Sequence, residues 1–374
     1  MYVTKIKLRR YRNIYEAEVI PARGVTVLRG DNGQGKTNLL EAVNVFSLGR
    51  PYRTRREKEL IYGIGGGRVV NGRRLGPGES SDFAEAALTF ADDKGRETVT
   101  EITWFLDGTK RIIREGARLK PSELIGRFRA VLFSPDDLTL VKEGPSGRRA
   151  FFDFAVSQLD QKYLASLTRY NHILSQRNAL LRGYKTADGS ARAALPAYTP
   201  YLAREAAYIT KVRGRYLELF SASAESIYSD MTGGQEKFAA AYLGQRTEEE
   251  FAQLFQDFES RDIEYGTTTT GPHRDDYSLL LNGVPARQMA SQGQQRSIVL
   301  SMKLAQGEVM KASSGEYPVF LFDDVLSEID SRRREYLLGS MKEGDRQMII
   351  TTCEKNIPGD KVYEVEKGKF IQTV

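Results

Sequence analysis

The segment Gly30-Asp31-Asn32-Gly33-Gln34-Gly35-Lys36-Thr37 matches the pattern G-x-x-x-x-G-K-[ST] of phosphate-binding loops. It follows an apolar run from Val25 to Leu28 that predicts a strand, and it precedes an apolar run from Leu39 to Phe46 with helical spacing. Glycines let backbone N–H groups approach phosphate oxygens, and the positive end of the following helix adds to this attraction. The context therefore favours a nucleotide site over an incidental glycine-rich turn.

The side chains of this loop predict ATP and Mg²⁺ as ligands. We expect Lys36 to reach the β and γ phosphates and the Thr37 hydroxyl to coordinate magnesium. Lys36 is accordingly a candidate catalytic residue. The expected ATP-binding residues within the loop and just after it are Gly30, Asp31, Asn32, Gly33, Gln34, Gly35, Lys36, Thr37 and Asn38.

A second acidic motif lies far downstream. Val319 to Phe322 is an uninterrupted apolar run that predicts a buried strand, and Asp323 and Asp324 follow it directly. Ligands bind at the carboxyl ends of strands in open α/β sheets, so we expect Asp323 to hold the metal and Asp324 to position or deprotonate the attacking water. Because Asp is shorter than the alternative Glu, we predict slow hydrolysis. The alternative interpretation is a solvated acidic turn.

Composition sets wide limits. The chain has 374 residues, of which 40% are hydrophobic, so it can form two domains or one large one. A net charge of +6 weakly favours an anionic partner. The single cysteine, Cys353, excludes a disulfide within one chain and any multi-cysteine metal site. The charged start and the lack of a long apolar run predict a cytoplasmic protein without a membrane segment.

The order of predicted elements gives an α/β fold with a discontinuous head. Strands dominate up to about residue 134, and we interpret them as one sheet-based layer. Helical spacing from 146 to 181 and from 201 to 231, around a predicted loop over 183–200, indicates a largely helical insertion. Alternating strands and helices then return. We therefore predict a head formed by 1–145 and 263–374, with an inserted helical subdomain at 146–262.

The later motifs resemble those of ABC-type ATPases. Ser291-Gln292-Gly293-Gln294-Gln295-Arg296 resembles their signature motif, and Ser327-Glu328-Ile329-Asp330 resembles their D-loop. Three further segments resemble the RecF family of bacterial recombinational repair proteins, and the similarity covers essentially the whole chain. These segments are Thr270-Gly271-Pro272-His273-Arg274-Asp275-Asp276, Phe133-Ser134-Pro135-Asp136-Asp137-Leu138 and Phe322-Asp323-Asp324-Val325-Leu326-Ser327-Glu328.

The resemblance implies a P-loop ATPase that works as an ATP-dependent homodimer. The signature of one copy would contact the γ-phosphate held by the loop of another, which assigns a role in trans to Ser291, Gln292, Gly293, Gln294 and Gln295. The pair Arg12-Asn13 matches the family's Arg-Asn pair and would touch the nucleotide, with a surface turn as the alternative. The resemblance also implies weak DNA-stimulated ATP hydrolysis, DNA repair at gapped or junction DNA, and partnership with RecR, RecO and RecA.

Two features depart from the family pattern. The segment Gly49-Arg50-Pro51-Tyr52-Arg53-Thr54 has Pro51-Tyr52 where the family usually has Ser-His before the arginine. No histidine follows His273, so the switch histidine of many ABC transporters is missing, and Thr351 or Thr352 occupies that neighbourhood.

A dense basic run follows the loop's helix and predicts contacts with DNA phosphates. Such contacts give affinity without sequence readout and a steep salt dependence. A solvated charged face is the alternative interpretation for each residue. The candidate DNA-binding residues are Arg50, Arg53, Arg55, Arg56 and Lys58, with Arg148 and Arg149 at the start of the helical insertion.

Rival classes differ in spacing and in helical content. A transporter subunit would place its signature much closer to the phosphate loop than the roughly 250 residues found here. An SMC-like chromosome protein would carry long heptad arms, which are absent from this sequence. A scaffold that binds ATP without hydrolysing it remains an open alternative.

Overall fold

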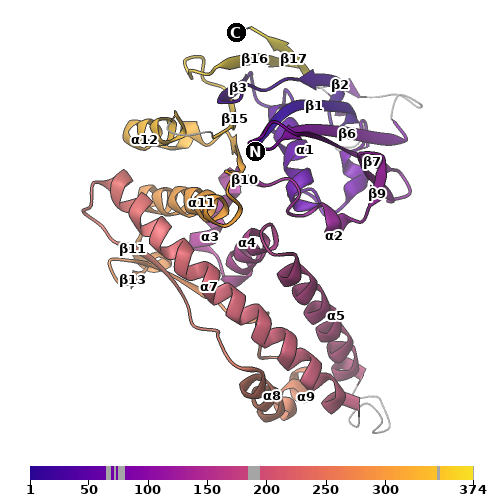
Figure 1. Ribbon diagram of the computed structural model, residues 1–374, viewed down its shortest axis with the longest axis vertical. Helices are drawn as coiled ribbons and strands as arrows, with labels where there is room; N and C mark the ends of the chain where they lie inside the picture. The colour runs from indigo at the N-terminus through magenta and orange to yellow at the C-terminus, as the bar shows by residue number, and fades with distance from the viewer. Residues whose placement is uncertain (65–68, 71–72, 75–80, 184–193, 343–345, 374) are drawn as a thin grey trace. The chain divides into compact units, whose positions relative to one another are not determined.

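The computed structural model describes residues 1–64, 69–70, 73–74, 81–183, 194–342 and 346–373 (Figure 1). The chain forms two compact units. Unit 1 comprises Met1–Asp137 and Gln306–Val374, and unit 2 comprises Leu138–Ala305. The second boundary falls within the long helix α11 (Gln292–Ser314).

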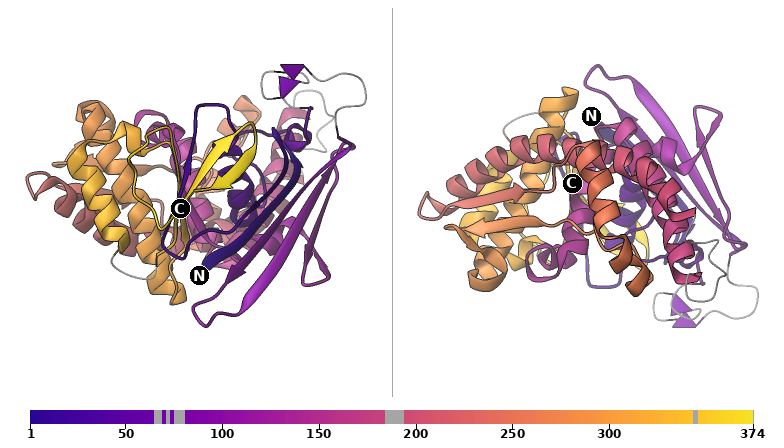
Figure 2. Two further views of the ribbon diagram at one scale, coloured as in Figure 1. Left: turned by 90° about the horizontal axis from the view of Figure 1, so that it is seen from above. Right: turned by 90° about the horizontal axis from the view of Figure 1, so that it is seen from below.

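An antiparallel six-stranded sheet forms one layer of unit 1, drawn in indigo and purple in Figure 2. Its strands lie in the order β2-β1-β6-β7-β8-β9, so neighbours in the chain are mostly neighbours in the sheet. Buried and less buried residues alternate along β6, as expected when one face of a sheet packs against a core. The strands are β1 (Tyr2–Tyr11), β2 (Ile14–Val19), β6 (Phe83–Ala91), β7 (Glu97–Phe105), β8 (Lys110–Arg114) and β9 (Ala117–Leu119).

A second six-stranded sheet joins the two ends of the chain. It has the order β10-β14-β15-β3-β16-β17, in which all neighbours are parallel except β16 and β17. Strands from before residue 134 thus pair with strands from after residue 318, which confirms the predicted discontinuity. The strands are β3 (Val25–Arg29), β10 (Ala130–Phe133), β14 (Val319–Asp323), β15 (Met348–Thr352), β16 (Lys361–Glu366) and β17 (Lys369–Gln372).

The single sheet layer predicted before residue 134 is therefore wrong. That part of the chain supplies strands to two sheets, because β3 and β10 leave the antiparallel neighbours and enter the parallel sheet. All five residues of β14 are buried, and this suits a central parallel strand covered on both faces.

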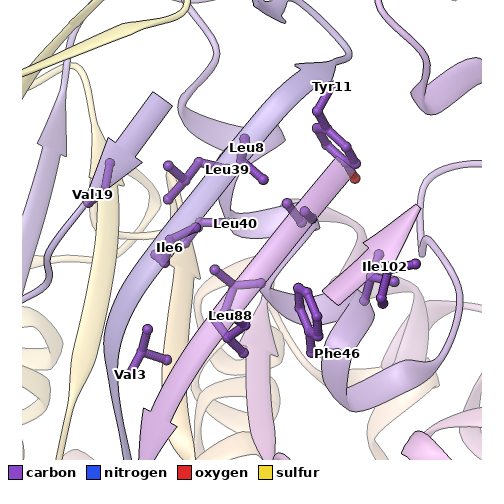
Figure 3. Packing of buried hydrophobic residues seen from close by; sticks show 14 of the residues in the cluster. Val3, Ile6, Leu8, Tyr11, Val19, Leu39, Leu40, Phe46, Leu88 and Ile102 are labelled. Atoms are coloured by element: carbon purple, nitrogen blue, oxygen red, sulfur yellow. The ribbon is translucent and has the colours of Figure 1, made fainter. Parts of the chain in front are cut away.

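Helix α1 (Lys36–Leu48) packs against both sheets. Leu39 and Leu40 belong to the same buried cluster as Ile6 of β1 and Leu321 of β14. Figure 3 shows Leu39 and Leu40 beside Ile6 and other apolar side chains of the antiparallel sheet. The helix after the phosphate-binding loop is thus fixed by apolar burial on both sides, which holds the loop itself in place.

The remaining elements of unit 1 are short, apart from one helix. They are η1 (Glu57–Leu60), β4 (Val69–Val70), β5 (Arg73–Arg74), α2 (Pro121–Leu124), η2 (Pro135–Leu138), η4 (Leu326–Glu328) and α12 (Ser331–Lys342). The last residue of η2 lies beyond the unit boundary.

Unit 2 contains the long helices α5 and α7. Helix α7 packs along α5, and β11, β12 and β13 form a three-stranded antiparallel sheet (Figure 1). The elements are α3 (Thr139–Lys142), α4 (Pro145–Ser157), α5 (Gln161–Gly183), η3 (Leu195–Tyr198), α7 (Thr199–Thr232), β11 (Phe238–Tyr242), α8 (Glu248–Asp257), α9 (Glu259–Tyr265), β12 (Tyr277–Leu281), β13 (Val284–Pro285) and α10 (Ala286–Met289).

Two sequence predictions in this region need correction. The continuous helix expected over 146–181 breaks before α5, because the Asp160 carboxylate accepts the backbone N–H groups of Lys162 and Tyr163 and starts a new helix. The loop expected over 183–200 contains helical turns from Leu195 onward, and its residues 184–193 lie outside the described part of the chain.

The compact units differ from the predicted domains. The units divide after Asp137 and after Ala305, whereas the sequence predicted an insertion over 146–262. In addition, β12, which was expected in the head, pairs with β11 in unit 2. Compact units are defined by the contacts between residues, whereas an inserted domain is defined by where a segment interrupts another domain in the sequence. The predicted domain boundaries therefore stay a prediction.

Candidate nucleotide-binding site

The phosphate-binding loop connects β3 to α1 at the carboxyl edge of the parallel sheet. Gly35 precedes the first residue of α1 and has a φ of 116°, which side-chain-bearing residues rarely adopt. A Cβ at this position would lie 3.0 Å from the Asn13 side-chain oxygen. The loop surrounds a pocket of about 190 Å³ that is lined by residues 31–38 together with Arg53, Asp324 and Thr351.

Lys36 is held inside the loop. Its side chain is 5% exposed, and its ammonium donates to the backbone carbonyls of Gly30 and of Asp31, the latter at 3.0 Å. It also lies 3.4 Å from the sulfur of Cys353, which follows β15. The ammonium therefore lies at the pocket, where its N–H groups donate to neutral carbonyl oxygens. A charged phosphate oxygen is a stronger acceptor and can replace them.

Three hydroxyl groups converge on the Asp323 carboxylate at the end of β14. Thr37 donates to Oδ1 at 2.6 Å, Thr351 donates to the same oxygen at 3.0 Å, and Tyr52 donates to Oδ2 at 3.3 Å. Burial, followed by the negative charge of Asp323, raises the pKa of Tyr52 well above its ordinary value, so the phenol keeps its proton. In the sequence, Tyr52 stands out only as a departure from the family pattern, and no signal there indicates a role for Thr351.

The oxygen atoms of Thr37 and Asp323 are suitable ligands for Mg²⁺. Asp323 is 6% exposed, and its Oδ1 lies beside the Thr37 hydroxyl, which gives two oxygen ligands from different elements. Within the described ranges, no three His, Cys, Asp or Glu side chains form a cluster able to hold a metal by themselves. Mg²⁺ commonly takes one or two protein ligands and completes its shell with phosphate oxygens and water, so Thr37 and Asp323 would suffice to hold it.

Asp324 stands next to this group with a constrained backbone. Its φ is 53°, an uncommon value for a residue other than glycine, and its backbone N–H donates to the Thr351 hydroxyl at 2.9 Å. The pocket includes Asp324 in its lining. The left-handed conformation turns the chain sharply after β14, so that both carboxylates lie at the same edge of the sheet.

Arg12 and Asn13 contact different parts of the site. Arg12 forms two hydrogen bonds of 2.8 Å with Glu41, a fully buried carboxylate of α1. Burial lowers the pKa of Arg12, but the bonds and charge of Glu41 outweigh it and leave the pKa above its ordinary value. Asn13 donates to the Gly33 carbonyl at 3.1 Å and accepts from Asn38 at 2.7 Å. Asn13 therefore braces the loop, whereas Arg12 anchors α1.

The turn between β16 and β17 supports the loop from the C-terminal end of the chain. The backbone N–H of Lys367 donates to the Gln34 side-chain oxygen at 2.6 Å, and that of Gly368 donates to the Gln34 carbonyl at 2.8 Å. Nothing in the sequence pattern indicated this contact with Gln34. Only pairing of β16 with β3 brings the two segments together.

The signature segment lies in unit 2 at the start of α11. Ser291 and Gln294 form a capping box, in which the Gln294 N–H donates to the Ser291 hydroxyl at 3.3 Å and the Ser291 N–H donates to the Gln294 side chain at 2.7 Å. Gln295 is 8% exposed and donates to the Ala290 carbonyl at 2.8 Å. Gln292 and Gly293 occupy the first turn, where backbone N–H groups are available to an anion.

The candidate DNA-binding residues occupy different environments. Arg50, Arg55, Arg56 and Lys58 are exposed. Arg53 also lines the nucleotide pocket and donates to Asn38 at 3.0 Å.

The two arginines of α4 are less accessible than those of the basic run. Arg148 is 6% exposed and forms two hydrogen bonds, of 2.8 and 2.9 Å, with Asp276 and two more with backbone carbonyls. This arrangement argues against a phosphate contact by Arg148. Arg149 is half-buried and donates to the Asp275 carbonyl at 2.7 Å.

Comparison with known proteins gives consistent results over the whole chain. The family described as RecF/RecN/SMC N terminal domain matches residues 2–369. The chain is 37% identical over 383 residues to the DNA replication and repair protein RecF of Clostridium acetobutylicum, covering 100% of both chains. It is 34% identical over 388 residues to the RecF of Latilactobacillus sakei, covering 100% of this chain and 99% of the relative.

Solved structures agree with this result. The recombination mediator protein RecF-ATPrS in the RecFOR pathway matches with a TM-score of 0.88 and 31% identity, covering 100% of this chain and 98% of that one. An SMC head bound to the C-winged helix domain of ScpA matches with a TM-score of 0.59 and 17% identity, covering 100% and 97%, which shows a shared fold. The part of the chain that the structure describes has no helical segment with the length and apolar character of a transmembrane span.

Proposed function

The chain belongs to the RecF family of DNA replication and repair proteins, and from this premise we propose that ATP joins two copies of it into a dimer that grips DNA. The phosphate-binding loop of one copy and the Ser291–Gln295 segment of the other would enclose each ATP. The dimer would bind duplex or gapped DNA in the cytoplasm, and slow hydrolysis would release it. RecR, RecO and RecA would be its partners in recombinational repair and replication restart.

The ATP part of this proposal is supported by the hydrogen bond from Thr37, which lines the loop pocket, to Asp323. In this site Mg²⁺ would supply positive charge beside the β and γ phosphates. Lys36 would exchange its carbonyl partners for phosphate oxygens. Asp324 would orient water and accept its proton, which would give slow hydrolysis, and we propose that DNA stimulates this weak activity.

Light scattering with ATP, with ADP and without nucleotide tests the proposal. We expect the mass to double with ATP but not with ADP or without nucleotide, because only the γ-phosphate can bridge the loop of one copy and the signature segment of another. A triphosphate-bound protein that stays a single copy at high concentration would contradict the proposed dimer. ATP and ADP must both be shown to bind, so that the comparison is between occupied states.

An ATP-binding scaffold or an SMC-like chromosome protein without significant hydrolysis is the alternative, since Asp324 is a short carboxylate in a constrained backbone. Phosphate release with and without DNA separates the two. We expect slow release from the wild type, stimulation by DNA, and none from Lys36→Ala. Wild-type release at the level of Lys36→Ala would favour the scaffold.

A further inference from the structure

A chain of short hydrogen bonds ties the signature segment to the end of α7. The buried Tyr228 donates to one oxygen of Glu236 at 2.6 Å, and the Gln294 side-chain amide donates to the other at 2.5 Å. The oxygen of the same amide accepts the Ser291 N–H at 2.7 Å. Nothing in the sequence pattern pointed to Glu236, because it lies 58 positions before Gln294.

Glu236 determines which way the Gln294 amide faces. A glutamine amide has an acceptor oxygen and a donor nitrogen of nearly equal size, so it can turn over at little steric cost. A carboxylate accepts only, and therefore Glu236 binds the nitrogen and directs the oxygen towards Ser291. If the amide turned over, its NH₂ group would face the Ser291 N–H and the capping box would be lost.

The loop that carries Glu236 is itself fixed. It connects α7 to β11, and the backbone N–H of Lys237 donates to the Asn282 side chain at 2.8 Å, while the Asn282 N–H donates to the Lys237 carbonyl at 2.7 Å. Tyr228 holds the carboxylate from the α7 side. A side chain supported from two sides can hold its neighbour in one geometry before any ligand arrives.

We propose that Glu236 is a positioning residue for the signature segment, which orients Ser291 and the first turn of α11 for the γ-phosphate of a partner copy. This inference rests on the proposed function. Glu236 does not touch the nucleotide in this scheme. It acts through Gln294, whose amide keeps the Ser291 N–H and hydroxyl in the capping geometry.

The test compares Glu236→Gln with wild type in two measurements. The variant keeps the shape of the side chain but removes its charge, and its own amide can present either a donor or an acceptor to Gln294, so it no longer directs the Gln294 oxygen towards Ser291. We expect ATP binding to a single copy to stay unchanged, because the loop pocket lies in unit 1. We expect the dissociation constant of the ATP-bound dimer to rise about tenfold, because the hydrogen bond to Gln294 loses its charged acceptor and the amide loses its fixed orientation.

Two further variants make the result decisive. Tyr228→Phe removes one support of Glu236 but leaves the Gln294 contact, so it should weaken the dimer less than Glu236→Gln. Glu225→Gln changes an exposed glutamate of α7 and should behave as wild type. A folded Glu236→Gln protein that binds ATP and dimerises as tightly as Glu225→Gln would overturn the inference. A wild type that never dimerises with ATP would instead overturn the proposed function, and the inference with it.

Discussion

Thr37 and Asp323 are separated by 286 positions in the chain, yet the threonine hydroxyl lies 2.6 Å from Oδ1 of the carboxylate. The bond joins the first turn of α1 to the last residue of β14. It places a hydroxyl and a carboxylate where one cation can bind both, beside a loop whose backbone suits phosphate. The phosphate-binding loop and the acidic edge of the candidate nucleotide site are thereby joined within unit 1.

Asp323→Asn and Asp324→Asn should fail in different ways. Loss of the Asp323 charge weakens the magnesium site, so we expect ATP-dependent dimer formation to require more Mg²⁺. Loss of Asp324 removes the group assigned to water, so we expect the dimer to form and persist while phosphate release falls at least about tenfold. Light scattering and phosphate release are measured on each variant across a magnesium series. If Asp323→Asn and Asp324→Asn showed the same defect, the separate roles in magnesium binding and in water activation would be contradicted.

Tyr52→Phe should raise the magnesium concentration needed for half-maximal ATP binding. The change removes only the hydroxyl that lies 3.3 Å from Asp323, and a hydrogen bond of this kind is worth about 1 kcal/mol, or about fivefold. Tyr15→Phe is the matched control, since Tyr15 is 60% exposed on β2. Identical magnesium titrations for the two variants would show that Tyr52 does not position the carboxylate.

Gly368→Ala should damage the nucleotide site from the C-terminal hairpin. Its φ is 77°, and a Cβ there would lie 2.5 Å from the Asn13 backbone oxygen. Gly116 has a similar φ of 82° but open space around its Cβ position, so Gly116→Ala measures backbone strain alone. We expect Gly368→Ala to lose about 1–3 kcal/mol more unfolding free energy than this control, and to bind ATP more weakly. Equal losses in urea unfolding would rule out the clash.

Arg55→Glu with Arg56→Glu should weaken duplex DNA binding and leave ATP binding intact. Each lost phosphate–arginine contact should make the slope of log affinity against log salt shallower by about 0.9, so the double variant should change it by about 1.8. Lys94→Glu with Arg96→Glu, in the turn between β6 and β7, reverses two exposed charges elsewhere in unit 1. Fluorescence anisotropy on one duplex at several salt concentrations gives both quantities. An unchanged slope for the Arg55 and Arg56 variant would remove these residues from the DNA site.

His273 should make unit 2 less stable in acid. Its ring accepts from the Tyr170 hydroxyl at 2.7 Å and lies 3.0 Å from the Thr268 carbonyl, and burial lowers its pKa to about 4. Between this value and the unfolded pKa of about 6.5, only the unfolded chain binds the proton. Acidification across that range therefore favours unfolding, by up to about 1.4 kcal/mol per pH unit.

Urea unfolding from pH 7 to pH 4.5 measures this effect by comparing two variants. His273→Gln should show a shallower loss of stability than wild type over that range. His172→Gln changes the other histidine, which is exposed on α5, and should follow the wild-type curve. If the His273→Gln curve ran parallel to wild type, protonation of this ring would not contribute.

The local parts of the nucleotide site could be predicted because they depend on neighbouring residues. The spacing of glycines, Lys36 and Thr37 determines a loop between a strand and a helix, and an apolar strand ending in two aspartates determines an acidic edge. The discontinuous sheet was also predictable, since buried parallel strands have a recognisable apolar pattern. Each of these patterns is contained in a few consecutive residues, so periodicity and residue type are sufficient to recognise it.

Only the tertiary structure assigned Tyr52, Thr351, Gln34 and Glu236 their partners. Each is a common residue in an ordinary local sequence, and its role depends on a hydrogen bond to a residue distant in the chain. The fold also paired Arg12 with Glu41, and it paired Arg148 with Asp276, away from the DNA contact that the charge of Arg148 suggested. Local sequence determines backbone conformation and apolar pattern, whereas the pairing of polar side chains follows from strand order and packing, which bring distant segments together.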